Sequence, residues 1–166
     1  MTYTTLISTV DLARNLDNPD FVIFDVRFTL DDESWGKRVY EESHIPGAIH
    51  ADVSEHLSGE IIPGKTGRRP FPRSEDFANL LSDWGITTTT QVICYDAESG
   101  LMAASRLWLM FRWMGHDQVA VLDGGIKRWI NEGLEVNQEV RSITPSNFTP
   151  KIREELFASV DEVDAV

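Results

Sequence analysis

The sequence predicts an α/β domain with a central, mainly parallel β-sheet flanked by helices on both faces. Short apolar runs of strand length alternate with segments of helical periodicity, as in parallel α/β folds. Residues 91–108 show this most clearly, since the apolar strand 91–95 leads through a polar loop into a helix. The 166 residues suffice for a domain of ordinary size with its own core.

The amino-terminal half contains the expected alternation of elements. Thr9 carries the hydroxyl of an N-cap, which predicts a helix from there to Leu16. The elements expected next are a strand over 21–26, a polar loop with a helical turn over 29–42, a turn over 44–47 and a short strand over 48–51.

A long loop separates the two halves, because residues 57–73 are rich in Gly, Pro and Arg. Ser74 is expected to cap the next helix, which stops at Gly85. The remaining expected elements are the strand 91–95, a helix from the 96–100 loop to Gly115, a strand over 119–122, a turn over 123–125 and a helix over 126–132 that ends at Gly133.

The chain is expected to contain one domain over 5–135, a linker over 136–157 and the start of a second, truncated domain over 158–166. The linker is polar and has no clear period. Ser159-Val160-Asp161 then repeats the pattern of Thr9-Val10-Asp11, a hydroxyl cap followed by valine and aspartate. We therefore expect the chain to be the first unit of a tandem protein.

Composition excludes several classes of function. The 27 acidic and 15 basic residues give a net charge of −12, which argues against nucleic acid and anionic membranes as partners. No segment reads as a signal peptide or reaches the length of a membrane span. A single cysteine, Cys94, fits a reducing compartment such as the cytosol, so a cytoplasmic location is expected. The spacing of His44, His50 and His56 is not that of a zinc site, and no metal or cofactor is expected.

The loop after the strand 91–95 is the expected functional site. Backbone N–H groups and a helix dipole converge at the carboxyl end of a parallel strand, where ligands bind in open α/β sheets. This active-site-like loop consists of Asp96, Ala97, Glu98, Ser99, Gly100, Leu101 and Met102.

Four motifs together resemble the rhodanese-like superfamily. They are Asp25-Val26-Arg27, the HIPGA sequence at 44–48, the strand–loop–helix at 91–108, and the LDGG sequence at 122–125 followed by Trp129. The resemblance is closest to the amino-terminal domain of tandem thiosulfate and 3-mercaptopyruvate sulfurtransferases. It implies a catalytic cysteine after the strand, whose thiolate takes a sulfane sulfur as a persulfide and passes it to an acceptor.

This sequence departs from that pattern at the decisive position, because Asp96 stands where the family has cysteine, and a carboxylate cannot carry a sulfane sulfur. The loop is also one residue longer than the cysteine-bearing loop. Both departures are typical of the non-catalytic amino-terminal domain. The resemblance therefore implies no catalytic residue in this chain, a carboxyl-terminal rhodanese domain of the same chain as its partner, and a small anionic sulfur donor with a thiol acceptor in the full protein.

Each candidate residue has a structural interpretation beside the functional one. Cys94 lies inside the strand and is expected in the core; a phosphatase would need arginine six residues later, where Gly100 stands. Asp96 is either a general base or an anchor of the loop, and a carboxylate at a helix N-terminus is favourable without chemistry. The residues expected near an interdomain or substrate pocket are Arg27, Trp35, His44, Lys65, Arg68 and Arg69.

The sequence therefore predicts the amino-terminal half of a sulfurtransferase that moves sulfane sulfur from thiosulfate or 3-mercaptopyruvate to a thiol or cyanide. The fragment alone is expected to be inactive. The alternative is a single, non-catalytic rhodanese-like module that binds or regulates a partner protein.

Overall fold

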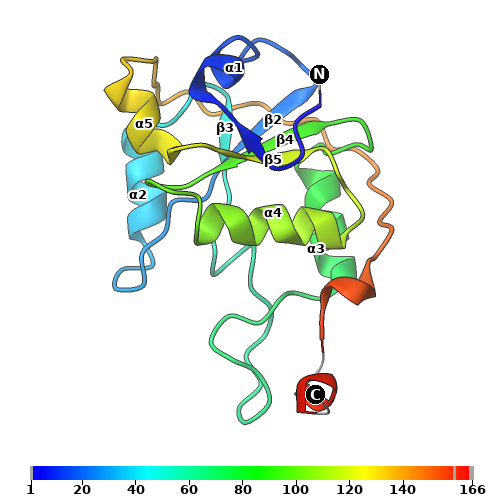
Figure 1. Cartoon of the computed structure of the whole chain (residues 1–166). Helices are drawn as coiled ribbons and strands as arrows, with labels where there is room; N and C mark the ends of the chain where they lie inside the picture. Colours follow the sequence, from blue (N-terminus) through cyan, green and yellow to red (C-terminus); the bar gives the residue numbers. More distant parts are fainter. Residues whose placement is uncertain (1, 159, 165–166) are drawn as a thin grey trace.

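A computed structural model of the chain describes residues 2–158 and 160–164. Within these residues, five strands form one all-parallel sheet in the order β1-β5-β4-β2-β3. The strands are β1 (Leu6–Ile7), β2 (Phe21–Asp25), β3 (Ala48–His50), β4 (Gln91–Tyr95) and β5 (Val119–Leu122). The helices are α1 (Thr9–Ala13), α2 (Trp35–Glu42), α3 (Ser74–Asp83), α4 (Ala103–Trp113), α5 (Gly125–Asn131) and α6 (Val160–Asp164), as Figure 1 shows.

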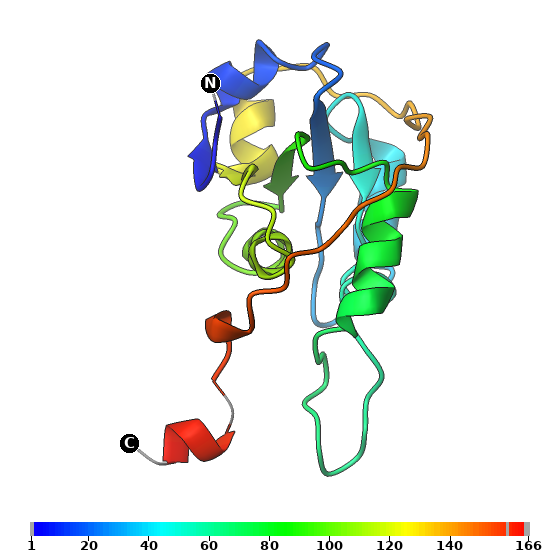
Figure 2. The same cartoon turned by 90° about the vertical axis from the view of Figure 1, so that its right-hand side faces the viewer.

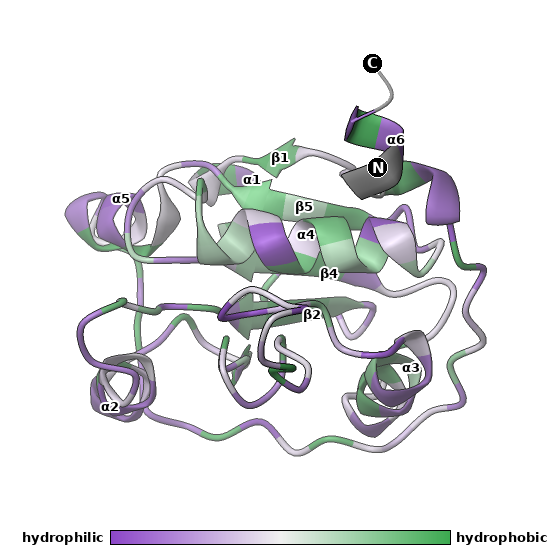
Figure 3. Ribbon diagram, turned by 90° about the horizontal axis from the view of Figure 1, so that it is seen from below, coloured by the Kyte–Doolittle hydropathy of each residue, from purple (hydrophilic) through white to green (hydrophobic). Residues whose placement is uncertain are grey.

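Helices cover both faces of the sheet, which confirms the predicted fold class. Successive side chains of a strand point to opposite faces, so each strand contributes to two separate core clusters. In β4, Val92 and Cys94 belong to the cluster beneath α3 and α4. Ile93 and Tyr95 belong to the cluster beneath α1, α2 and α5. Figure 3 shows α4 lying across β4 and β5 on the first of these faces.

Three amino-terminal elements differ from the prediction. Ser8, rather than Thr9, is the N-cap of α1, since its Oγ accepts a bond from Asp11 N at 3.1 Å, and the helix ends at Ala13. The two-residue strand β1 was not predicted, because it is too short to show a period. Residues 35–42 form a full helix, α2, in which the buried residues are Gly36 and Tyr40.

The helix α3 begins one residue earlier than a cap at Ser74 implies. Arg73 occupies the N-cap position and makes no side-chain cap bond, and Ser74 is the first helical residue. The helix ends as predicted near Gly85, whose positive φ of 72° suits glycine.

The segment predicted as a linker wraps around the domain as an extended strap, defined as residues 137–153 (the orange trace in Figures 1 and 2). Its backbone bonds the body at Asn137, Ser146 and Lys151. Phe148, from its middle, is buried beside α3. After the strap come a 3₁₀ turn, Glu154–Leu156, and α6. Ser159, the first residue of the repeated pattern, lies outside the described residues.

Two predicted absences, that of a membrane span and that of a metal site, can be compared with the described residues. None of their helices is long and apolar enough to cross a bilayer. Between residues 2 and 158 and in 160–164, no group of three or more His, Cys, Asp or Glu side chains is placed to hold a metal ion.

Two buried histidines are expected to make the fold sensitive to acid. Burial lowers the pKa of both His56 and His116 below its ordinary value. Near pH 6.5 these histidines therefore bind protons in the unfolded chain but stay neutral in the folded chain. Proton binding favours the unfolded chain, so the stability that is present above that pH is lost as the pH falls. We expect the free energy of unfolding to fall between pH 7.5 and pH 5.5, as measured by urea denaturation.

The matched variant is His56→Asn combined with His116→Gln, because these amides replace the imidazole nitrogens in their contacts with Asp52 N and Thr90 O. The double variant should lose less stability over the same pH interval than the parent chain. An equal loss in both proteins would show that the acid sensitivity has another origin.

Candidate functional site

The loop that follows β4 is organised around the side chain of Asp96. This side chain is 7% exposed and turns back into its own loop. Its Oδ1 accepts bonds from Gly100 N at 2.8 Å and Glu98 N at 3.3 Å, and Oδ2 accepts one from Ala104 N at 3.4 Å. Inward-pointing backbone N–H groups next to a helix N-terminus form an anion-binding site. The carboxylate of Asp96 occupies that site.

The first turn of α5 supports the loop through backbone hydrogen bonds. Ile126 N donates to Asp96 O at 3.0 Å, and Lys127 N donates to Ala97 O at 3.1 Å. Gly125 makes this approach possible, because a Cβ there would lie 2.6 Å from Asp96 O and its φ is 56°. The LDGG motif therefore acts as a platform for the loop, and the exposed ion pair of Lys127 with Glu98 adds to it.

A pocket of about 210 Å³ opens beside the loop. Leu101 and Met102 flank it and are 80% and 66% exposed, which leaves an apolar patch at this edge of the domain. Phe28 forms part of the wall and was not predicted, although its position three residues after β2 placed it at the same edge of the sheet. The lining residues are Phe28, Asp96, Ala97, Glu98, Ser99, Met102 and Ala103.

Cys94 does not reach this pocket. Its side chain is fully buried in the cluster beneath α3 and α4. Burial raises the pKa of the Cys94 thiol well above its ordinary value, so the nucleophilic thiolate is disfavoured.

Arg27 is engaged in a buried ion pair instead of lining the pocket. Its Nη2 lies 2.6 Å from Asp25 Oδ2, and both side chains are almost completely buried. The same Nη2 donates to the backbone oxygens of Val39 and Ser43 at 3.0 and 2.6 Å. Tyr95 also donates to Asp25 Oδ2 at 2.7 Å. This network ties the ends of β2 and β4 to the end of α2.

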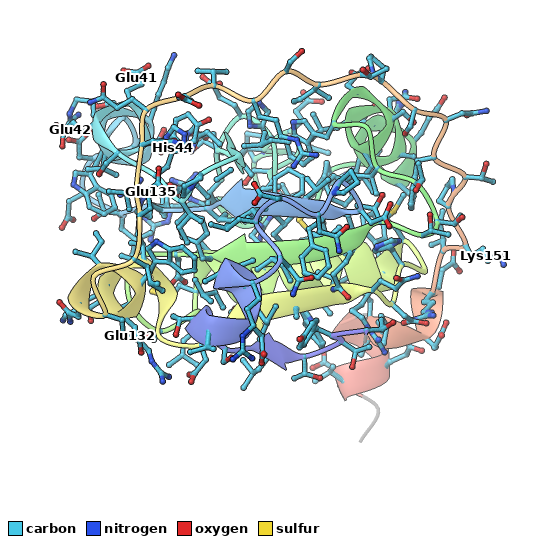
Figure 4. The ribbon with its side chains drawn as sticks, turned by 90° about the horizontal axis from the view of Figure 1, so that it is seen from above. Glu41, Glu42, His44, Glu132, Glu135 and Lys151 are labelled. Carbon is cyan, nitrogen blue, oxygen red and sulfur yellow. The ribbon has the colours of Figure 1, made fainter. Side chains whose placement is uncertain are left out.

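His44 is buried between α2 and the start of the strap (Figure 4), and it is not among the residues that line the pocket. Its ring stacks on Tyr40 with centroids 4.0 Å apart. Nδ1 lies 2.8 Å from Tyr40 O, and Nε2 lies 3.1 Å from Glu139 O. The histidine of the HIPGA turn thus joins α2 to the strap through backbone carbonyls.

The three basic residues that were predicted near the pocket from the 57–73 loop, Lys65, Arg68 and Arg69, do not act as one cluster. Lys65 and Arg68 are exposed, whereas Arg69 folds back over the ring of Phe28 at 4.5 Å. The Arg69 guanidinium also bonds Glu33 at 2.8 Å and contacts the hydroxyl of Ser54. Arg69 therefore stands behind the Phe28 wall of the pocket. Trp35 begins α2, is half-buried and is not among the lining residues.

Comparison with known proteins identifies sulfurtransferases among the relatives of this chain. The model of the family described as "Rhodanese-like domain" matches residues 8–132. A probable 3-mercaptopyruvate sulfurtransferase of Pseudomonas aeruginosa is 40% identical, and the match covers 89% of this chain and 52% of that protein. A thiosulfate sulfurtransferase of Cricetulus griseus is 30% identical over 97% of this chain and 54% of its own length.

Solved structures show the same likeness. The 3-mercaptopyruvate sulfotransferase of Escherichia coli superposes with a TM-score of 0.82 at 27% identity, over 98% of this chain and 61% of that one. The 3-mercaptopyruvate sulfurtransferase of Leishmania major gives 0.77 at 31% identity, over 88% and 39%. The chain spans about half the length of the curated relatives it matches.

Proposed function

Because the chain belongs to the rhodanese-like family, we propose that it is the amino-terminal, non-catalytic half of a tandem-domain sulfurtransferase. Relatives named as thiosulfate and 3-mercaptopyruvate sulfurtransferases support this, as does their length of about twice the matched region. The full protein would move a sulfane sulfur from one of these small anionic donors to a thiol or to cyanide.

The single observation that carries the proposal is the arrangement around Asp96. In a catalytic loop, the inward N–H groups would stabilise a cysteine thiolate and the persulfide that it forms. Here the carboxylate of Asp96 already accepts bonds from Glu98, Gly100 and Ala104. The chain's one cysteine, Cys94, is buried elsewhere. In this proposal the nucleophile comes from a part of the protein that follows this domain.

The transfer itself needs no oxidant. A thiolate attacks the outer sulfur of thiosulfate, an S–S bond forms with the cysteine, the S–S bond of the donor breaks, and sulfite leaves. Cyanide or a thiolate then attacks the outer sulfur of the persulfide and releases the cysteine thiolate. In this proposal the present domain supplies the pocket beside Phe28 and an apolar surface, Leu101 and Met102, that the second domain covers.

The test compares residues 1–166 with the protein extended to the end of its reading frame. Thiocyanate is measured from thiosulfate and cyanide, and pyruvate from 3-mercaptopyruvate with a thiol. The extended protein should be active, serine in place of its downstream loop cysteine should abolish the activity, and Cys94→Ala should retain it. Turnover by residues 1–166 alone would refute the proposal.

The exposed Leu101 and Met102 also favour a second candidate, a binding module that presents this edge to a partner protein. The same experiment separates the two. A reading frame that ends near Val166, or an extended protein without turnover, would leave the binding module as the function of the domain.

A further inference from the structure

Three aromatic rings meet where the chain leaves the domain. Phe157 packs edge-on against Phe71 of the 57–73 loop, with centroids 5.2 Å apart, and against Trp113 of α4 at 5.7 Å. Phe71 and Trp113 contact each other at 5.8 Å. Each ring therefore touches both of the others, and we call this set the aromatic clasp. Aromatic pairs in these geometries are attractive beyond the area that they bury.

The clasp is connected to both ends of the 57–73 loop through Arg106. The guanidinium of Arg106 lies 4.6 Å above the ring of Phe71, on α4's side of the loop. It donates to Leu57 O at 2.7 Å and to the backbone oxygens of Arg69 and Pro70 at 3.1 Å each. The base of the loop is thereby fastened to α4, while its middle projects away from the domain (Figure 2).

The direction in which the chain leaves is fixed just before the clasp. Arg153 holds both carboxylate oxygens of Asp117, at 2.7 and 2.8 Å, and Arg112 bonds the same carboxylate at 2.7 Å. The backbone N–H of Arg153 donates to Trp113 O at 2.8 Å. Bidentate arginine pairs restrict geometry as well as adding energy. Phe157 thus follows a firmly placed anchor by only four residues.

The loop and the departing segment carry opposite charge. Residues 57–73 contain four basic residues and one acidic one, whereas residues 154–164 contain five acidic residues and no basic one. Both project on the same side of the domain, beyond α3 and α4 (Figures 1 and 2). The loop also exposes apolar side chains, since Ile61 and Ile62 are 56% and 45% exposed.

We propose that the 57–73 loop, which we call the seat, is the surface against which the chain following residue 157 packs. Phe157 is the positioning residue that holds the loop and that chain together. This inference rests on the proposed function, because it takes the following chain to be a second folded unit. Arg69 gives the seat its connection to the site, since the same loop places its guanidinium over Phe28, the wall of the pocket.

The first arm of the test uses residues 1–166 and amide hydrogen exchange across the 57–73 loop. Phe157→Ala should speed exchange there about tenfold, the scale expected when aromatic contacts holding a segment are lost. Phe157→Tyr should restore slow exchange, because the ring is kept. Leu156→Ala is the matched control, being equally exposed and outside the clasp, and should change nothing. Equal exchange in Phe157→Ala and the parent chain would overturn the role of Phe157.

The second arm uses the extended protein and small-angle X-ray scattering. The double charge reversal Lys65→Glu with Arg68→Glu should enlarge the radius of gyration, whereas Lys37→Glu, an exposed charge change on α2, should not. An unchanged radius of gyration would overturn the proposal that the following chain packs against the 57–73 loop. Neither arm measures sulfur transfer. An extended protein without turnover would therefore refute the proposed function, whereas the packing of the chain against the loop would still be decided by exchange and scattering.

Discussion

Replacing Arg27 with alanine is expected to lower the free energy of unfolding by about 3–5 kcal/mol, the range found when one partner of a buried ion pair is removed. The carboxylate of Asp25 would stay buried without its cation, with only the hydroxyl of Tyr95 and the backbone N–H of residue 27 as donors. The carbonyl oxygens of Val39 and Ser43 would lose the same donor. Urea denaturation at neutral pH, followed by tryptophan fluorescence, measures the change.

The matched control is Arg38→Ala, which removes another Arg–Asp pair nearby. Arg38 contacts Asp32 at 2.8 Å, but both side chains are about half exposed, so water and salt weaken the pair. The denaturation midpoint of this variant should stay close to that of the parent chain. A similar, small loss in both variants would contradict the structural role assigned to the buried network.

Replacing Asp96 with alanine is expected to cost about 3 kcal/mol, because buried N–H groups would lose a charged acceptor. The groups concerned are the amides of Gly100, Glu98 and Ala104. We expect the loop to open locally, so amide exchange over 96–104 should accelerate more than exchange in β4. Urea denaturation gives the global loss, and exchange mass spectrometry locates it.

Asp96→Asn is the companion variant, because its amide oxygen keeps one acceptor in the same place while removing the charge. Its loss should be smaller than that of the alanine variant, and exchange in the loop should stay slow. If alanine and asparagine were equally mild, the carboxylate would not be organising the loop.

The sequence was sufficient to predict the strands that are buried on both faces. Residues 21–24, 92–95 and 119–122 are continuous apolar runs, as expected of strands that are covered on both faces of the sheet. β1 and α2 give weaker signals. A strand of two residues has no period, and α2 buries little besides Gly36 and Tyr40. Gly36 matters through close packing, since a Cβ there would overlap Arg27 O, and such a contact has no sequence signal.

The sequence places the loop of the candidate site at the end of β4, where the structure has it, but the surroundings of that loop were harder to predict. Asp25 and Arg27 are two residues apart, so their pairing follows from strand geometry. The partner of His44 lies 95 residues away, on a strap that has no periodicity. Arg69 is held against the domain by Glu33 and Phe28, whereas Lys65 is exposed. These partners are distant in the sequence, so the pattern of basic residues could not predict which of them would be held.

The strap has a consequence for where this module begins and ends. The match to the family model ends at residue 132, yet the chain continues to complete the core for another twenty residues. Phe148 fills the layer beside α3, Arg141 binds Phe21 O, and His44 has its second carbonyl partner there. The unit that folds is thus longer than the segment that the family model matches. A boundary drawn at the end of that match would cut away part of the domain's own interior.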